Sequence, residues 1–378
     1  IRSRSAKNTS LVTTGDHAAA ARIGKVREYL LGQEVIVLDR DIGQNPENRF
    51  RVRYHAPKAH ASLAHMLSRN LFAPTGNKAP DIVVVQVPDW DELVIYVHLA
   101  PDGCVFTWVM GSDYYGEAKM GALRAAMHMA REQRGQLGVH AGSKIARLQV
   151  NGQMEDKGML IFGLSGTGKT TITVNDFGLS APERVVVLQD DINLIRGDLY
   201  TYGTEEAYYV KTDNINSQPE LLPAIREPVS IGENVYVDPQ THAIDFDNWS
   251  VSTNGRFIIP RRAVANTQEA IDLPKVDIIC FNSRRYDVPP FARMVSPAQA
   301  AAFLMLGEST FTSADDPARE GESQRVVAFD PFVLNQPHKQ GNIFLKILQQ
   351  NPNVQVFLVN TGKVGGMKDG IKITPGAM

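Results

Sequence analysis

The feature that most constrains this chain is a glycine-rich segment at residues 163–170. Its letters, Gly-Leu-Ser-Gly-Thr-Gly-Lys-Thr, fit the pattern G-x-x-x-x-G-K-[ST] at every fixed position. An apolar run at residues 159–162 precedes it and predicts a strand, and residues 170–174 predict the start of a helix. Strand, loop and helix in this order predict a nucleotide-binding α/β domain.

The segment also has the chemistry that a phosphate site needs. Glycines at 163, 166 and 168 permit a tight path in which backbone N–H groups point at phosphate oxygens. Lys169 offers a charge to the β- and γ-phosphates, and the Thr170 hydroxyl is a ligand for Mg²⁺. The alternative is a plain glycine-rich turn, which would not require the final Lys-Thr.

A pair of carboxylates follows about twenty residues later. Residues 185–188 are an apolar run that predicts a strand, and Asp190 and Asp191 come just after it. A carboxylate at the end of a strand beside a phosphate loop is a common Mg²⁺ ligand, and two of them suggest two roles. The alternative is that one of them caps the turn before Ile192.

The length of the chain, 378 residues, predicts two domains or three. Residues 1–136 mix strands and helices, and residues 137–378 alternate short strands with turns, so we expect an N-terminal α/β lobe and a C-terminal lobe with the loop. Helices are expected at 22–31, 59–71, 116–134, 170–174, 296–306 and 342–350. Strands are expected at 35–39, 81–87, 93–99, 105–109, 146–150, 158–162, 184–188, 193–195, 234–237, 256–259, 276–281 and 354–359, and residues 1–20 show no clear element.

Composition excludes several classes of protein. Lys and Arg number 39 against 41 Asp and Glu, so no overall attraction to nucleic acid or to an anionic membrane is expected. No apolar run has the length of a transmembrane helix. Two distant cysteines, Cys104 and Cys280, favour the reducing cytoplasm, and both are expected to be small buried residues. Arg49, Arg51 and Arg53 alternate along one predicted strand face, which we expect to be solvated.

Residues 162–171 resemble the kinase-1 segment of ATP-dependent phosphoenolpyruvate carboxykinase, and Asp190-Asp191 resembles its acidic kinase-2 pair. Other blocks are similar in the same order along residues 35–375. They are Tyr114-Tyr115-Gly116-Glu117-Ala118-Lys119, Val139-His140, Tyr209-Val210-Lys211, Glu233-Asn234-Val235, Thr253-Asn254-Gly255-Arg256, Val288-Pro289-Pro290 and Leu358-Val359-Asn360-Thr361-Gly362.

The resemblance implies a two-lobed α/β phosphoenolpyruvate carboxykinase-like fold, with the phosphate loop in the C-terminal lobe and the active site in the cleft between lobes. It also implies the reaction: oxaloacetate is decarboxylated and takes the γ-phosphoryl group of ATP, giving phosphoenolpyruvate, CO₂ and ADP. Mg²⁺ accompanies the nucleotide, and a second metal ion, usually Mn²⁺, bridges substrate and γ-phosphate.

The resemblance further implies roles for single residues. It implies catalytic roles for Lys169, Arg256, Asp191, Ser165, Tyr114 and Lys119. It implies nucleotide contacts by Gly163, Leu164, Ser165, Gly166, Thr167, Gly168, Lys169, Thr170, Thr171, Lys211 and Arg256. It implies metal ligation by Thr170, Asp190, Asp191 and His140. From the residues alone, His140 is equally well a partly buried histidine at the end of a strand.

Three departures from the family pattern stand out. The metal-binding Lys position falls on Met120, whose neutral thioether suits Mn²⁺ poorly. The carboxylate-binding Arg expected in a Thr-Gly-Arg-Ser-Pro segment is absent around Gly15 and Asp16. The adenine-stacking Arg is missing from residues 370–375, where the chain ends.

These observations leave three hypotheses. The first, which the resemblance favours, is a diverged ATP-dependent carboxykinase acting on oxaloacetate. The second is a phosphotransferase that uses another acceptor on the same scaffold, and no motif for such an acceptor supports it. The third is a non-catalytic nucleotide-binding module, against which Lys169, Thr170, Asp191 and Arg256 argue.

Overall fold

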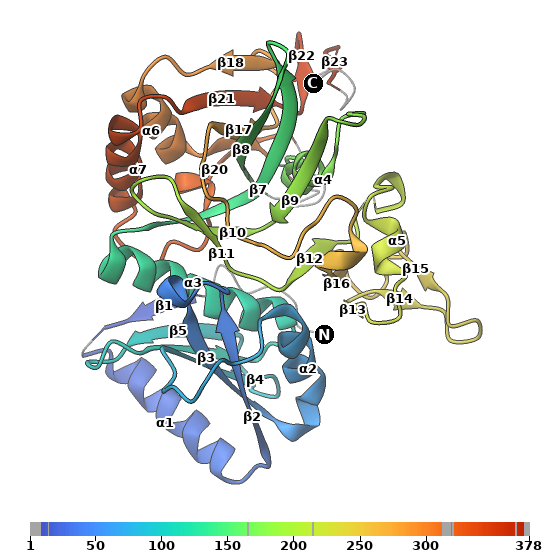
Figure 1. Cartoon of the computed structure of the whole chain (residues 1–378). Coiled ribbons are helices and arrows are strands. Elements are labelled where there is room, and N and C mark those ends of the chain that lie inside the picture. Colours follow the sequence, from blue (N-terminus) through green and yellow to red (C-terminus); the bar gives the residue numbers. More distant parts are fainter. Residues whose placement is uncertain are drawn as a thin grey trace. The chain divides into compact units, whose positions relative to one another are not determined.

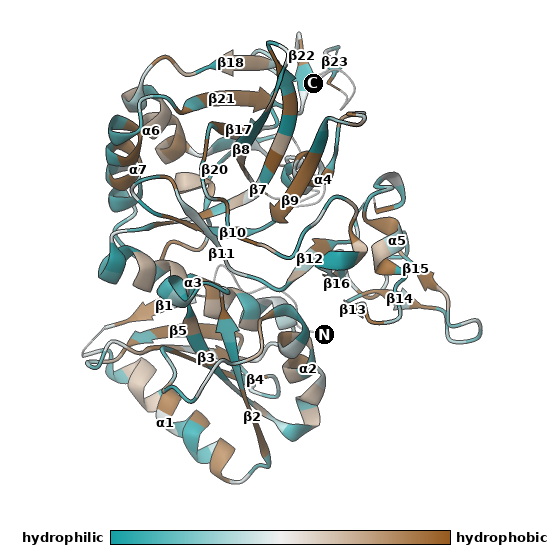
Figure 2. Cartoon of the chain, in the orientation of Figure 1, coloured by the Kyte–Doolittle hydropathy of each residue, from teal (hydrophilic) through white to brown (hydrophobic). Residues whose placement is uncertain are grey.

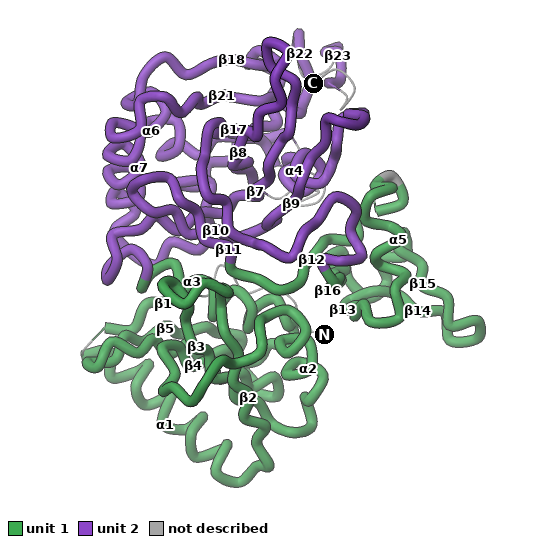
Figure 3. The backbone as a smooth tube through the Cα atoms, in the orientation of Figure 1, with its two compact units in different colours: residues 1–129, 204–260 green, residues 130–203, 261–378 purple. Residues whose placement is uncertain are grey.

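The computed structural model of the chain describes residues 9–13, 15–164, 166–213, 215–311, 319, 321–366 and 369–373. It is a mixed α/β structure with several sheets (Figure 1). The chain divides into two compact units, which Figure 3 colours separately. Unit 1 contains residues 1–129 and 204–260, and unit 2 contains residues 130–203 and 261–378. The sequence predicts one crossing near residue 136, whereas the chain passes between the units three times.

Unit 1 is built on a six-stranded sheet with the order β1-β5-β6-β4-β3-β2. The pairs β1–β5, β3–β4 and β4–β6 are parallel, and β2–β3 and β5–β6 are antiparallel. The strands are β1 (Thr9–Val12), β2 (Val35–Ile42), β3 (Phe50–Pro57), β4 (Ile82–Val87), β5 (Val94–Leu99) and β6 (Val105–Met110). Every residue of β4 is buried, as its nearly unbroken run of β-branched residues predicts.

Helices and smaller sheets complete unit 1. The helix α1 buries Ala19 and Val26 against Val85, Tyr96 and Trp108 of the sheet. The helices are α1 (His17–Leu31), α2 (Ala61–Asn70), α3 (Tyr115–Arg134, which begins in this unit) and α5 (Leu222–Ile225), with 3₁₀ turns η2 (Pro46–Asn48), η3 (Lys58–His60) and η4 (Ile215–Ser217). A second sheet has the order β12-β16-β13, and β14 pairs with β15. Their bounds are β12 (Ala207–Lys211), β13 (Ile231–Glu233), β14 (Tyr236–Val237), β15 (Ile244–Asp245) and β16 (Arg256–Pro260).

Unit 2 is built on an eight-stranded sheet with the order β11-β10-β7-β8-β17-β21-β18, in which β9 also pairs with β7. The strands are β7 (Leu137–Val150), β8 (Gln153–Gly163), β9 (Arg184–Gln189), β10 (Ile192–Ile195), β11 (Thr201–Gly203), β17 (Ile278–Ser283), β18 (Phe291–Arg293) and β21 (Gln355–Asn360). Because β8, β17 and β21 are parallel, their carboxyl ends meet at one edge, the usual ligand-binding edge of such sheets.

The core of unit 2 lies between this sheet and two helices. Phe162 and Phe281 contact Phe344 of α7, with ring centroids 6.3 and 6.1 Å away. Figure 2 shows β9 as hydrophobic over most of its length. The remaining elements are α4 (Lys169–Val174), α6 (Pro297–Leu306), α7 (His338–Gln350), η5 (Arg261–Ala263), η7 (Val327–Phe329), β19 (Glu308–Thr310), β20 (Ser323–Arg325), β22 (Lys363–Val364) and β23 (Ile371–Lys372).

In two places the sequence prediction missed part of the regular structure. Residues 9–12 form β1, and α1 begins at His17, where Asp16 accepts a hydrogen bond from the backbone N–H of Ala19. The strand expected at 146–150 begins nine residues earlier, at Leu137. Its first half is rich in small residues because neighbours approach closely: a Cβ at Gly142 would lie 2.2 Å from the Thr173 hydroxyl. Both cysteines are free; Cys280 is buried as expected, and Cys104 is only half-buried.

Candidate active site

The glycine-rich loop joins β8 to α4, which confirms the predicted order of strand, loop and helix. Gly166 and Gly168 have φ angles of 75° and 87°, a region that favours glycine. Leu164 and Thr167 are buried, and the Thr167 hydroxyl donates to the Leu164 carbonyl at 2.8 Å. Gly163 ends β8, Thr171 lies half-buried in α4, and Ser165 lies outside the described residues.

Lys169 links this loop to the two carboxylates that follow β9. Its buried ammonium donates to the Asp190 carbonyl at 2.6 Å and to Asp191 Oδ1 at 2.9 Å. The Thr170 hydroxyl donates to Asp190 Oδ2 at 3.1 Å. Four residues chosen from two separate motifs therefore lie within hydrogen-bond distance of one another.

His140 of β7 joins the same cluster. Its Nε2 lies 2.9 Å from Asp191 Oδ1, and its Nδ1 lies 3.3 Å from the Phe329 carbonyl. Burial and the nearby Lys169 ammonium lower the pKa of His140, against the opposite effect of Asp191. The lowered pKa favours the neutral form of the imidazole.

We tested whether this donor set suits a divalent cation. A neutral imidazole nitrogen and carboxylate oxygens are both metal ligands, and the contact of Nδ1 with a backbone carbonyl is typical of ligating histidines. The chemistry of the donor set therefore fits. Within the described part of the chain, however, no group of three or more His, Cys, Asp and Glu side chains is arranged to hold a metal ion.

A second set of predicted residues lies in unit 1, on one face of the β12-β16-β13 sheet. Lys211 pairs with Arg256 across β12 and β16, and Glu233 of β13 pairs with Arg256 on the other side. Since strand side chains alternate between faces, Tyr209 shares this face with Lys211. The Arg256 guanidinium lies 5.5 Å from the centre of the Tyr209 ring, and its Nε donates to Asn254 Oδ1 at 3.2 Å.

The first turns of α3 border this face. Lys119 is 0% exposed, and its ammonium lies 3.1 Å from Glu205 Oε1 and 5.0 Å from the centre of the Tyr209 ring. Tyr114 is buried against Gly116, where a Cβ would lie 2.3 Å from the tyrosine ring. Met120, the next residue of the helix, is half-buried.

The structure thus gathers the predicted residues in two sets, one in each unit. The unit 2 set is the glycine-rich loop with Lys169, Thr170, Asp190, Asp191 and His140. The unit 1 set is Tyr114, Lys119, Lys211 and Arg256.

Sequence reasoning assigned no role to several residues in these sets. Tyr209 and Glu233 stand in quoted family blocks, and strand alternation would have placed them on the face of Arg256. Arg284 is the first residue after β17, and its Nη1 donates to the Gly166 carbonyl of the loop at 3.0 Å. Arg284 directly follows a strand that pairs in parallel with β8, and this position at the carboxyl edge of the sheet could have indicated a contact with the loop.

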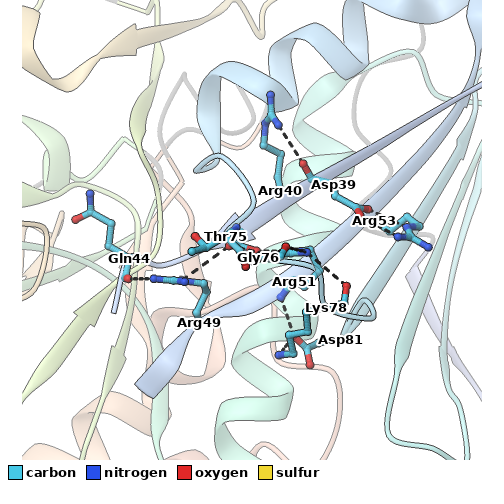
Figure 4. Close-up of polar contacts among 11 residues, drawn as sticks. Asp39, Arg40, Gln44, Arg49, Arg51, Arg53, Thr75, Gly76, Lys78 and Asp81 are labelled. Atoms are coloured by element: carbon cyan, nitrogen blue, oxygen red, sulfur yellow. Dashed lines mark hydrogen bonds and ion pairs between the residues drawn. The ribbon is translucent and has the colours of Figure 1, made fainter. Parts of the chain in front are cut away.

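The expected solvated face of arginines on β3 was wrong for its central member. Arg51 is 3% exposed, and its Nε donates to Asp41 Oδ1, which is also buried, at 2.6 Å. The Arg51 guanidinium also donates to the Thr75 carbonyl at 2.9 Å (Figure 4). The Thr75 N–H donates back to Asp41 Oδ2. Arg51 therefore fastens the chain at Thr75 to the sheet of unit 1. Arg53 pairs with Asp39 at 2.8 Å and is half-buried, so it is solvated only in part.

None of the described helices has the length and apolar character needed to cross a bilayer.

A family model described as phosphoenolpyruvate carboxykinase matches residues 11–374 of the chain. A relative from Aeropyrum pernix, named phosphoenolpyruvate carboxykinase (ATP), is 38% identical over 335 residues, which are 89% of this chain and 67% of the relative. Relatives with the same name from Ruegeria pomeroyi and Cereibacter sphaeroides are 27% and 26% identical, covering 89% and 93% of this chain and 63% and 66% of theirs. The chain spans about two thirds of the length of these curated relatives.

Proposed function

Because the chain belongs to the phosphoenolpyruvate carboxykinase family, we propose that it converts oxaloacetate and ATP to phosphoenolpyruvate, CO₂ and ADP. The observation that carries this proposal is the unit 2 cluster, in which Asp191 Oδ1 lies 2.9 Å from both Lys169 Nζ of the glycine-rich loop and His140 Nε2. The names of the relatives give this one activity, so another acceptor or a non-catalytic role is not favoured.

The reaction needs two bond changes that cations assist. The carbon–carbon bond to the departing carboxylate breaks, and its electron pair becomes that of the enolate as CO₂ leaves. The enolate oxygen then attacks the γ-phosphorus, and the bond to the β-phosphate oxygen breaks to release ADP. Negative charge gathers on the phosphoryl oxygens, which Lys169 and the loop N–H groups are suited to stabilise. We assign Arg256, Lys119 and Tyr114 to catalysis and Lys211 to nucleotide contact, as the family resemblance implies.

The donor atoms of the unit 2 cluster are of the kinds that divalent cations bind. We assign Thr170 and Asp190 to the Mg²⁺ that accompanies ATP, and His140 and Asp191 to a second ion, for which Mn²⁺ suits a nitrogen and oxygen donor set. When bound, such an ion supplies Lewis-acid polarisation of phosphate and enolate oxygens. Without it, the Lys169 ammonium orients the Asp191 carboxylate by hydrogen bonding, and His140 Nε2 lies 2.9 Å from the same carboxylate oxygen.

The same proposal assigns a role to each part of the chain. We infer a two-lobed carboxykinase-like arrangement in which residues 137–378 carry the phosphate loop and residues 1–136 serve the small-molecule substrate. The loop lies in unit 2, which supports the first assignment, and residues 204–260 belong to unit 1, so we extend the substrate lobe to them. Two cysteines that are free rather than bridged suit the cytoplasm, where we place the reaction.

Phosphorus NMR of ATP with the purified protein tests the proposal, with and without oxaloacetate and Mn²⁺. We expect the ADP and phosphoenolpyruvate signals to grow together, and only when oxaloacetate is present. ATP loss that gives inorganic phosphate alone, or that ignores oxaloacetate, would contradict the proposed reaction.

A further inference from the structure

Glu233, at the end of β13, contacts three other elements of unit 1. Its Oε2 accepts a hydrogen bond from the Tyr115 backbone N–H at 2.9 Å, and its Oε1 accepts one from the Tyr209 hydroxyl. Arg256 lies directly opposite it in the register of β13 and β16. Burial raises the pKa of Glu233, while the hydrogen bonds from Tyr209 and the backbone and the charge of Arg256 act against that rise.

The contact with Tyr115 places a carboxylate at the first residue of α3, a helix of twenty residues. The N–H groups of a first helical turn have no partner within the helix, and the helix dipole is positive there. Glu233 therefore caps α3 from a strand 118 residues further along the chain. This cap fixes where the helix starts, and so where Tyr114 and Lys119 lie.

Through Tyr209, Glu233 is also linked to the two cations of the unit 1 set, Lys119 and Arg256. The Tyr209 ring lies 5.0 Å from the Lys119 ammonium and 5.5 Å from the Arg256 guanidinium, and Tyr115 meets it edge-on at 5.5 Å. A tyrosine ring attracts cations over its face. The Tyr209 hydroxyl, held by Glu233, sets the orientation of that ring.

A chain of polar contacts also links the Tyr115 side chain to Lys119. The Tyr115 hydroxyl donates to Asn70 Oδ1 at 2.7 Å, the Asn70 amide donates to Glu205 Oε1 at 3.2 Å, and Glu205 pairs with Lys119. Tyr115 is thus held at its backbone by Glu233 and at its hydroxyl by Asn70, which is itself bonded to Glu205, the partner of Lys119. The start of α3 has no freedom to turn without breaking one of these contacts.

We propose that Glu233 is a positioning residue for the reaction: it ties the start of α3 to the β12-β16-β13 sheet and thereby aligns Lys119 and Arg256. This inference rests on the proposed function, because the two cations are assigned to catalysis there. An acid that only stabilised the fold would not need the hydrogen bond to Tyr209, whose ring lies beside both cations.

Kinetics of Glu233→Ala and Glu233→Gln test the proposal, at a temperature where circular dichroism shows every variant folded. Glu227→Gln is the matched control, because Glu227 is an exposed acid of the same segment. We expect kcat to fall about 10- to 100-fold in Glu233→Ala, since a small misplacement of reacting groups costs that much, and less in Glu233→Gln, which keeps an acceptor. Glu227→Gln should match the wild type.

A double-mutant cycle separates positioning from mere stability. If Glu233 acts through Arg256, Glu233→Ala should cost far less in the Arg256→Ala background than in the wild type. Losses in kcat that multiply in the double variant, or a wild-type kcat in Glu233→Ala, would overturn the proposal.

Hydrogen–deuterium exchange keeps this inference distinct from the proposed function. We expect faster exchange at the first amides of α3 in Glu233→Ala and no change in Glu227→Gln. A wild type that binds ATP but makes no phosphoenolpyruvate refutes the proposed function alone. Unchanged exchange at the start of α3 refutes the role of Glu233 whatever the activity.

Discussion

Lys169 is the residue on which the nucleotide proposal depends most directly. Its ammonium contacts Asp191 and the Asp190 carbonyl, at the end of a loop whose backbone suits phosphate. We expect Lys169→Ala to weaken ATP binding about 10- to 100-fold, because a charge-assisted hydrogen bond contributes about 1.5–3 kcal/mol. Titration calorimetry measures the change. Lys157→Ala is the control, since Lys157 is a lysine of β8 paired with Glu155 on the same strand; equal affinities of the two variants would refute the role of Lys169.

Asp191 is the residue on which the metal proposal depends. Its carboxylate contacts both Lys169 and His140. Asp191→Asn keeps the shape and removes the charge, so we expect Mn²⁺ affinity to fall by at least about tenfold and phosphoenolpyruvate formation to fall with it. Electron paramagnetic resonance of free Mn²⁺ measures the affinity. Asp198→Asn, which alters an exposed carboxylate paired with Arg196, should bind Mn²⁺ as the wild type does.

How far the sequence predicts single residues depends on how local their partners are. The loop, Lys169 and the acidic pair lie within 29 positions, so their motif spacing carried the prediction. The burial of Arg51 depends on Asp41 from another strand and on Thr75 from a later loop. Alternation along β3 shows which arginines share a face and not what covers that face, so no local pattern predicts the burial.

At the scale of elements, β7 supports the phosphate loop through Lys144. The buried Lys144 ammonium donates to the Ile172 carbonyl at 2.5 Å and the Asn175 carbonyl at 3.4 Å, so it caps the carboxyl end of α4. Phe177, Asp176 and the Cys280 thiol also face it. The amino end of α4 is the phosphate loop, and Lys144 therefore fixes the helix from the opposite end.

The titration of Lys144 predicts a pH dependence of stability. Burial lowers the pKa of Lys144 from 10.5 to about 8. Between pH 8 and 10.5 the unfolded chain binds a proton that the folded chain does not, so the free energy of unfolding should rise with pH in this window, by about 3 kcal/mol from this group. The contribution is complete above 10.5 and is lost as the pH falls through 8.

Urea unfolding of the wild type and of Lys144→Met at several pH values measures this contribution. Other lysines and tyrosines titrate in both proteins, so their effects cancel in the difference. The burial of Cys280 raises its pKa to about 12 in the folded chain, and its titration in the unfolded chain is common to both proteins and cancels as well. A difference curve that is flat between pH 8 and 10.5 would contradict the assignment.

Elements with a strong hydrophobic period were predicted well, and those that depend on distant pairing were not. The helices α2, α3 and α6 lie within one or two residues of their expected bounds. By contrast, β1 exists because it pairs in parallel with β5, more than eighty residues later. The first half of β7 is a strand because β8, β9 and β10 pair with it, although its small residues carry no strand pattern.

At the scale of the whole molecule, the unpredicted feature is the return of residues 204–260 to unit 1. The sheet β12-β16-β13 brings Lys211 and Arg256 beside α2 and α3, elements that precede it by more than seventy residues. The predicted pattern of strands, helices and turns changes once along the sequence, near residue 136. Nothing in that pattern indicates that residues 204–260 return to unit 1. The family resemblance names Lys211 and Arg256 as site residues, and only the tertiary contacts show that they share a sheet face.

Nucleotide binding should also be visible in the stability of the whole chain. A ligand that binds only the folded state, at about 100 times its Kd, raises the free energy of unfolding by about 2.7 kcal/mol. Hydrogen exchange with and without Mg²⁺ and ATP measures this rise strand by strand. We expect added protection in β8, β17 and β21, because the loop leaves that parallel edge. Lys169→Ala should lose most of the added protection at the same ATP concentration, and equal protection in the two proteins would show that ATP binds elsewhere.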